Sequence, residues 1–78
     1  MPCVHQLANC KIVIYADDHN PPHFHVKGAG WSYVVDIRTL SVTRGNKPAG
    51  NGDSGALDWA TENVEYLLEM WEKYNERD

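Results

Sequence analysis

The residues of this 78-residue chain that could do chemistry gather in one segment, residues 17–26, which holds three histidines and two aspartates. An imidazole titrates near neutral pH, so it can donate or accept a proton, and it is a common metal ligand. His23 and His25 are two positions apart, which puts both rings on one face of a strand with about 6 to 7 Å between their backbones. They are the catalytic candidates, as an acid and a base.

The loop before these two histidines could add metal ligands. Two prolines stiffen it, because each fixes its own backbone and restricts the residue before it. An aspartate there could also orient an imidazole ring through a hydrogen bond. The candidate ligands for a divalent metal are Asp17, Asp18, His19, His23 and His25. A metal site needs a third and a fourth ligand, and only this loop offers them, so we predict no cofactor and keep a divalent metal as the alternative.

A binding surface for a protein or a small ligand is another use of the same residues. Tyr15 and Asp36 join it if strand register brings them to the face of the histidines, which sequence alone does not decide. The candidate binding residues are therefore Tyr15, Asp18, His19, His23, His25 and Asp36. A third alternative is structural, because the His-x-His pattern occurs in ordinary strands and an aspartate can simply satisfy a ring N–H.

Three to four strands should position this segment. Residues 11–16 (KIVIYA) form an apolar, β-branched run typical of a strand buried on both faces. Residues 23–28 alternate, with Phe24 and Val26 on one face and the histidines on the other. Residues 31–37 alternate in the same way, and residues 40–43 predict a short fourth strand. Hairpin connections between these strands imply an antiparallel sheet.

An amphipathic helix should complete the fold. Apolar residues recur at helical spacing from about Gly55 to Asn75, and Asp53 or Ser54 is the expected N-cap. The preceding residues 44–55 are rich in glycine and predict a flexible connection. We therefore predict a single α+β domain over residues 1–78, with a small antiparallel sheet of three to four strands packed on one face by this C-terminal helix. The histidine pair should point away from the helix.

A second line of residues on the same helix lies off its main apolar stripe. It consists of Trp59, Asn63, Tyr66 and Met70. A large apolar ring outside the core often marks a subunit contact, and a chain of this length has a thin core. These features predict a homodimer.

Charge and hydropathy exclude some classes of protein. The net charge is −4, yet residues 53–78 carry eight acidic and two basic side chains, whereas residues 1–52 carry three acidic and five basic ones. Five scattered basic residues are weak support for nucleic-acid binding and leave it open. No apolar run approaches the roughly 20 residues of a membrane span. The first residues show no secretory signal and two cysteines make no disulfide framework, so we expect a cytoplasmic protein with no membrane contact.

Motifs across nearly the whole chain resemble one bacterial family. They are the string Asp18-His19-x-Pro21-Pro22-His23-Phe24-His25-Val26, the strand Val35-Asp36-Ile37, and Trp59-x-x-x-Asn63 with Trp71 on the final helix. This pattern resembles small proteins of the domain-of-unknown-function family four-one-six-zero. The resemblance implies a cytosolic prokaryotic protein whose gene neighbours that of another small protein, in a pair proposed to be toxin–antitoxin-like. It implies no activity.

Three functions follow from the residues and the resemblance together. The leading hypothesis is a partner-binding module of a toxin–antitoxin-like pair, with the histidine face and the acidic helix as contact surfaces. The alternative is a histidine-based or metal-assisted hydrolase, with a ribonuclease-like toxin as the natural case. The third is a plain metal-binding or structural module. The sequence leaves open whether the protein is an enzyme.

Overall fold

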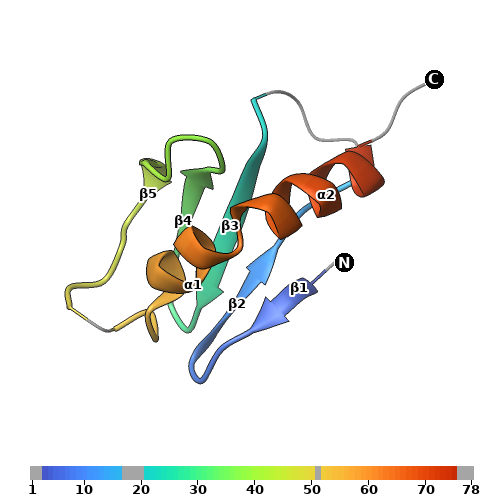
Figure 1. Ribbon diagram of the computed structural model, residues 1–78. Helices are drawn as coiled ribbons and strands as arrows, with labels where there is room; N and C mark the ends of the chain where they lie inside the picture. Colours follow the sequence, from blue (N-terminus) through green and yellow to red (C-terminus); the bar gives the residue numbers. More distant parts are fainter. Residues whose placement is uncertain (1–2, 17–20, 51, 76–78) are drawn as a thin grey trace.

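The computed structural model describes residues 3–16, 21–50 and 52–75, and within them it shows a five-stranded sheet and two helices (Figure 1). The strands are β1 (Cys3–Gln6), β2 (Cys10–Val13), β3 (His23–Gly28), β4 (Trp31–Asp36) and β5 (Val42–Gly45), and the helices are α1 (Ala56–Glu62) and α2 (Val64–Asn75). Each strand pairs antiparallel with the next along the chain, so the sheet is a simple meander. The predicted α+β class is confirmed. Neither helix is both long and apolar enough to cross a membrane.

The prediction of three to four strands was wrong, because β1 adds a fifth strand at one edge. Its sequence, Cys-Val-His-Gln, has one β-branched residue and no regular alternation of apolar and polar residues, so it gives little strand signal. Pairing with β2 nevertheless fixes it, with His5 opposite Ile12 and Gln6 opposite Lys11. The register shifts between Cys3 and His5, and such an irregularity breaks the alternation that sequence patterns rely on.

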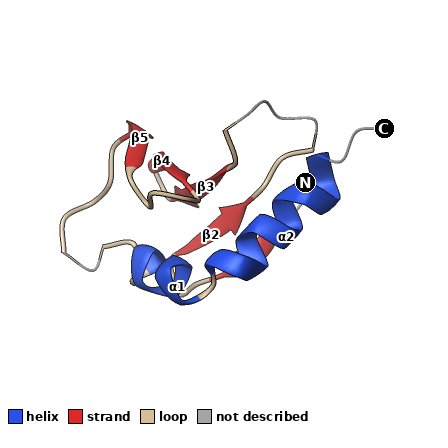
Figure 2. Ribbon diagram, turned by 45° about the horizontal axis from the view of Figure 1, so that its top comes forward, coloured by secondary structure: helices blue, strands red, loops and turns tan. Residues whose placement is uncertain are grey.

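The two helices lie against one face of the sheet (Figure 2). Phe24 and Val26 of β3 point to this face and have no exposed surface. Tyr33 and Val35 of β4 continue the same layer, and Leu67 of α2 packs into it without exposed surface. Full burial of side chains of this size contributes about 1.5 to 3 kcal/mol each. The predicted contact between the Phe24–Val26 face and the helix stripe is confirmed.

The prediction of one continuous helix from Gly55 to Asn75 was wrong, since the helix is interrupted at Asn63. This residue has φ −131° and ψ 29°, and its side-chain amide donates to the carbonyl of Trp59 over 2.8 Å. Side-chain bonds of this kind let asparagine compete with regular helix geometry. The helix resumes where the backbone N–H of Leu67 donates to the carbonyl of Asn63 over 2.9 Å. The apolar stripe continues across the break, so helical periodicity did not reveal it.

The N-cap of α1 is Gly55, not Asp53 or Ser54 as predicted. Gly55 has φ 73°, a left-handed conformation that glycine adopts without a clash from Cβ. The carboxylate of Asp53 accepts the N–H of Gly55 itself over 3.3 Å, and the hydroxyl of Ser54 donates to Asn9. The side chains of Asp53 and Ser54 therefore form hydrogen bonds within and to the glycine-rich connection, and neither caps the first turn of α1. Whether residues 44–55 are flexible stays a prediction.

The line of residues that suggested a homodimer packs on β1 of the same chain. The ring of Trp59 stacks on that of His5, with centroids 4.2 Å apart and planes 8° from parallel. Tyr66 meets Trp59 edge-on at 6.2 Å, and its hydroxyl donates to the carbonyl of Val4 over 3.3 Å. The strand that sequence reasoning missed thus supplies the contact that a second subunit was expected to supply. The homodimer stays a prediction, but this line of residues on the helix no longer supports it.

Candidate functional site

The sheet face that the helices leave uncovered carries most of the predicted site, and we call it the open face. Strand alternation and register assign to it Lys11, Val13, His23, His25, Lys27, Ser32, Val34, Asp36 and Arg44. In its central row, His25 of β3 and Arg44 of β5 lie on either side of Val34 of β4. In the next row, His23 lies directly opposite Asp36. The register that sequence alone left open therefore brings Asp36 to the histidines.

Ring contacts hold the two histidines in place. The ring centroids of His23 and His25 are 5.4 Å apart, and Tyr15 meets His25 edge-on at 4.7 Å. The Nδ1–H of His23 donates to the carbonyl of Pro21 over 2.8 Å, because a carbonyl oxygen can only accept. The stiff Pro21–Pro22 segment thereby orients the His23 ring.

Register places both histidines on the open face, but the ring of His23 also reaches the helix layer, which the prediction did not include. The ring of His23 lies 5.1 Å from the ring of Trp71 on α2. His23 is the first residue of β3, so it sits at the end of the sheet that the last turns of α2 reach. Asn75 of α2 reaches the same end and donates to the carbonyl of Tyr15 over 3.1 Å.

A cavity of about 470 Å³ opens on this face beside the histidines. Its polar wall is made by His23, His25, Asp36, Thr43 and Arg44. Pro21 and Val34 add the apolar part of the lining. The volume falls within the range of small-molecule sites, and an apolar wall with a few converging polar groups is their usual composition.

The structure brings several of the predicted site residues together, and the other predicted residues are not among those it describes. It groups Tyr15, His23, His25 and Asp36. Asp17, Asp18 and His19 lie outside the described residues. Across residues 3–16, 21–50 and 52–75, no three side chains of the metal-binding types come together as a site for an ion. The catalytic, binding and metal roles of these residues stay predictions.

Thr43 and Arg44 are the site residues that sequence reasoning missed. The fourth strand was predicted over residues 40–43, whereas β5 spans Val42–Gly45 and places Arg44 opposite Val34. All four residues of β5 are exposed, and its register with β4 shifts between Val34 and Val35, so no apolar alternation marks it. The residue in the sequence that could have marked the end of this strand is Gly45, the last residue of β5, which has a φ of 86°.

Charges are sorted between the two sides of the molecule. The open face carries Lys11, Lys27 and Arg44, with Asp36 as its one carboxylate among the described residues. The helices carry five exposed acidic side chains and, of basic ones, Lys73. The acidic set is Asp58, Glu62, Glu65, Glu69 and Glu72. Fixed charges arranged in this way make the open face the side that attracts anions.

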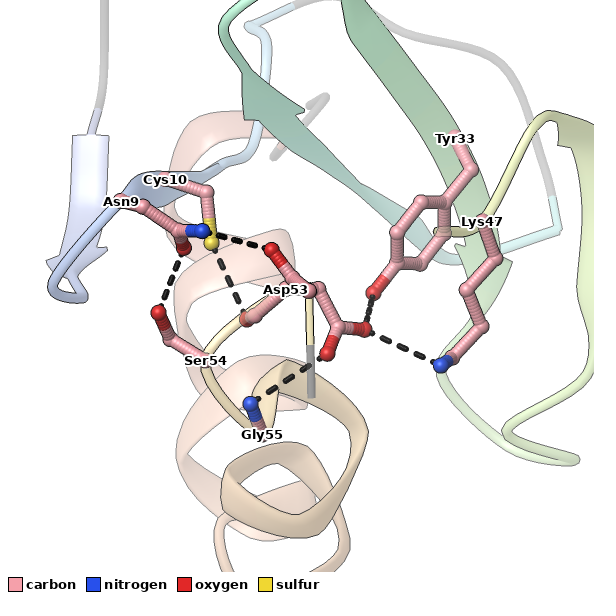
Figure 3. A network of polar contacts seen from close by, with 8 residues as sticks. Asn9, Cys10, Tyr33, Lys47, Asp53, Ser54 and Gly55 are labelled. Atoms are coloured by element: carbon pink, nitrogen blue, oxygen red, sulfur yellow. Dashed lines mark hydrogen bonds and ion pairs between the residues drawn. The ribbon is translucent and has the colours of Figure 1, made fainter. Parts of the chain in front are cut away.

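A second polar cluster surrounds Asp53, which is only 2% exposed (Figure 3). The hydroxyl of Tyr33 donates to its Oδ2 over 2.5 Å, and the Nζ of Lys47 lies 3.3 Å from the same oxygen. The thiol of Cys10 donates to the backbone carbonyl of Asp53 over 3.2 Å, and the side chain of Asn9 donates to Gly52 over 2.6 Å. These bonds attach the glycine-rich connection to β2 and β4.

The ionisation of this cluster follows from burial and from its hydrogen bonds. Burial acts to raise the pKa of Asp53, but the bonds from Tyr33 and Lys47 outweigh it and hold the pKa below its ordinary value. Burial raises the pKa of Tyr33 well above its ordinary value, and the bond to the Asp53 carboxylate adds to the rise. Burial also raises the pKa of the Cys10 thiol. The cluster is closed around its own groups, so we assign it to structure rather than to ligand binding.

Comparison with known proteins identifies the family. The model of the family described as Domain of unknown function (DUF4160) matches residues 10–72, from the start of β2 into the last turns of α2. The chain belongs to the DUF4160 family. The matched DUF4160 segment contains the open face and the cavity, and β1 lies before it. No match was found among curated proteins or among solved structures.

Proposed function

We propose that this DUF4160 protein is a cytoplasmic partner-binding module of a toxin–antitoxin-like pair, and that its open face is the contact surface. The sorting of charge between the two sides of the molecule carries the proposal. Opposite charges that face each other across an interface speed association and select the partner. A face with Lys11, Lys27 and Arg44 therefore favours a partner with an acidic surface.

The position of the helices supports the same surface. They cover the other side of the sheet, where the apolar residues are already buried in the core. On the open face, His23, His25, Lys27 and Arg44 keep part of their surface exposed. The cavity at this site adds a concave feature into which a side chain of the partner can insert.

The experiment measures binding to the small protein encoded by the neighbouring gene, by isothermal titration calorimetry. The variant Arg44→Glu reverses one charge on the open face, and Lys73→Glu makes the same change in net charge on α2. We expect Arg44→Glu to weaken binding by at least about tenfold and Lys73→Glu by less than about twofold. Equal losses in the two variants, or binding unchanged in Arg44→Glu, would overturn the assignment of the surface.

A histidine-based hydrolase of the ribonuclease type is the second candidate. The pairing of His23 and His25, with ring centroids 5.4 Å apart at the wall of the cavity, favours it, because an acid and a base on one substrate need such proximity. Incubation with a fluorescent single-stranded RNA tests it, with and without a chelator to separate a metal-assisted reaction. Cleavage that disappears in His25→Ala supports the hydrolase, and cleavage that survives in this variant contradicts it.

A further inference from the structure

We propose that the cavity on the open face is a binding site for the phosphate group of a small molecule, held between Arg44 and the imidazoles of His23 and His25. This inference goes beyond partner binding, since it concerns the chain alone and a ligand that is not a protein. It rests on the side chains that line the cavity and on their order across the strands.

Strand register places the guanidinium and the imidazoles on opposite sides of the cavity. His25 and Arg44 flank Val34 in one row, two strands apart, which corresponds to roughly 10 Å between their backbones. Side chains in one row of a sheet stand on the same face, so the guanidinium and the imidazole can approach one anion from two directions. His23 lies 5.4 Å from His25, between ring centroids, and widens the imidazole side.

The kind and number of donors favour phosphate over carboxylate. A guanidinium offers a planar pair of N–H groups that matches two phosphate oxygens. Thr43 lies in the same wall, but its hydroxyl donates to the carbonyl of Val34 over 3.4 Å, and the Nδ1–H of His23 donates to Pro21. A further donor beside the guanidinium would therefore come from a remaining imidazole nitrogen in its protonated form. A carboxylate offers two oxygens to these N–H donors, whereas a phosphate monoester offers three terminal oxygens that accept hydrogen bonds strongly.

The cavity has room for a ligand larger than the phosphate itself. A volume of about 470 Å³ is well above that of one phosphate group and matches the sites of small organic ligands. Pro21 and Val34 give the apolar wall against which the organic part can pack. We therefore infer a phosphate monoester, such as a nucleoside monophosphate, rather than inorganic phosphate alone.

Asp36 is the one feature of the described lining that opposes an anion, and it gives the proposal a specific test. Its Oδ1 accepts the backbone N–H groups of Arg38 over 2.8 Å and Thr39 over 3.1 Å, so the carboxylate holds the turn after β4. The variant Asp36→Asn keeps an oxygen for these two bonds and removes the negative charge. A purely structural role for the cavity residues gives no reason for this variant to change phosphate affinity.

The experiment is a titration of the purified protein with inorganic phosphate and with adenosine monophosphate, followed by NMR of the imidazole carbon-bound protons. Resonances of His23 and His25 should shift in a saturable manner, while His5, stacked on Trp59 on the helix side, serves as the internal reference. We expect Arg44→Gln to weaken both ligands by about tenfold or more and Asp36→Asn to tighten them severalfold. Arg44 lies in an exposed edge strand, so its substitution leaves the core intact.

Three outcomes overturn the proposal: no saturable shift of His23 and His25, affinities unchanged in Arg44→Gln, or acetate binding as tightly as phosphate. Tighter binding of adenosine monophosphate than of phosphate supports the monoester, whereas equal binding overturns that part and leaves a site for phosphate alone. Because no partner protein is present, failure here is distinct from failure of partner binding. The converse also holds, since the charge-reversal experiment above needs no small ligand.

Discussion

Replacing Tyr33 with phenylalanine tests the polar cluster that attaches the glycine-rich connection to the sheet. Tyr33 is 1% exposed, and its ring lies in the core beside Val26, its partner across β3 and β4. The substitution keeps the ring and removes the hydroxyl that donates to Asp53. It therefore opens no large cavity and isolates one hydrogen bond to a buried carboxylate.

The expected magnitude follows from the partners that remain. A hydrogen bond to a charged group contributes about 1.5 to 3 kcal/mol, more than a bond between neutral groups. In Tyr33→Phe the carboxylate of Asp53 keeps Lys47 on Oδ2 and the Gly55 N–H on Oδ1, so it is weakened but not left alone. We expect a loss of about 2 kcal/mol in the free energy of unfolding. For a domain of this size that corresponds to a melting temperature lower by roughly 10 °C.

Urea denaturation of Tyr33→Phe and Tyr66→Phe provides the comparison. The control makes the same chemical change at a side chain that is 39% exposed and donates to Val4 over 3.3 Å. A bond at the surface is replaced by water, so Tyr66→Phe should cost less than about 0.5 kcal/mol. Equal losses in the two variants, or a loss below about 0.5 kcal/mol for Tyr33→Phe, would refute the reasoning.

Three further predictions concern other parts of the fold. Folding raises the pKa of Tyr33, so the stability that its protonated hydroxyl contributes is fully present below the ordinary tyrosine pKa and is lost as the pH rises above about 10. In thermal melts, the melting temperature should therefore fall more steeply at alkaline pH for the natural protein than for Tyr33→Phe. Leu67→Ala removes a fully buried side chain and should cost about 2 to 5 kcal/mol in urea, whereas Glu65→Ala on the exposed side of the same helix should cost less than about 0.5 kcal/mol; similar costs would contradict the assignment of the two faces. Trp59→Ala removes the stack on His5, so the amide protons of β1 should exchange faster with solvent while those of β3 are unaffected, and unchanged exchange in β1 would show that the ring does not hold this strand.

Alternation was the most informative part of the sequence. Residues 23–28 and 31–37 predicted β3 and β4 because each buries one face in the helix layer, and burial on one face imposes a period of two. β1 and β5 lie at the edges of the sheet, where fewer residues are buried and both registers shift. Their positions depend on pairing with a neighbour, which a local pattern does not contain.

The candidate site was predictable in part for the same reason. His23 and His25 are two positions apart in the sequence and were found from this spacing alone, whereas Arg44 joins them only through the register of β4 with β5. The burial of Asp53 was also invisible, because a lone aspartate among glycines resembles an ordinary turn. Its significance comes from Tyr33, twenty residues away in the chain.

The meander has a consequence for how the chain folds. Every pairing in the sheet joins strands that are neighbours in sequence, so each needs only a short loop to close, at a small entropic cost. Among the contacts that span the chain, two are made by α2, through Tyr66 to Val4, 62 residues apart, and through Asn75 to Tyr15, 60 residues apart. Local hairpins can therefore form first, and docking of α2 closes the two ends of the chain onto them late. In stopped-flow kinetics, weakening the β3–β4 hairpin should mainly slow folding and weakening α2 should mainly speed unfolding, and the reverse pattern would contradict this order.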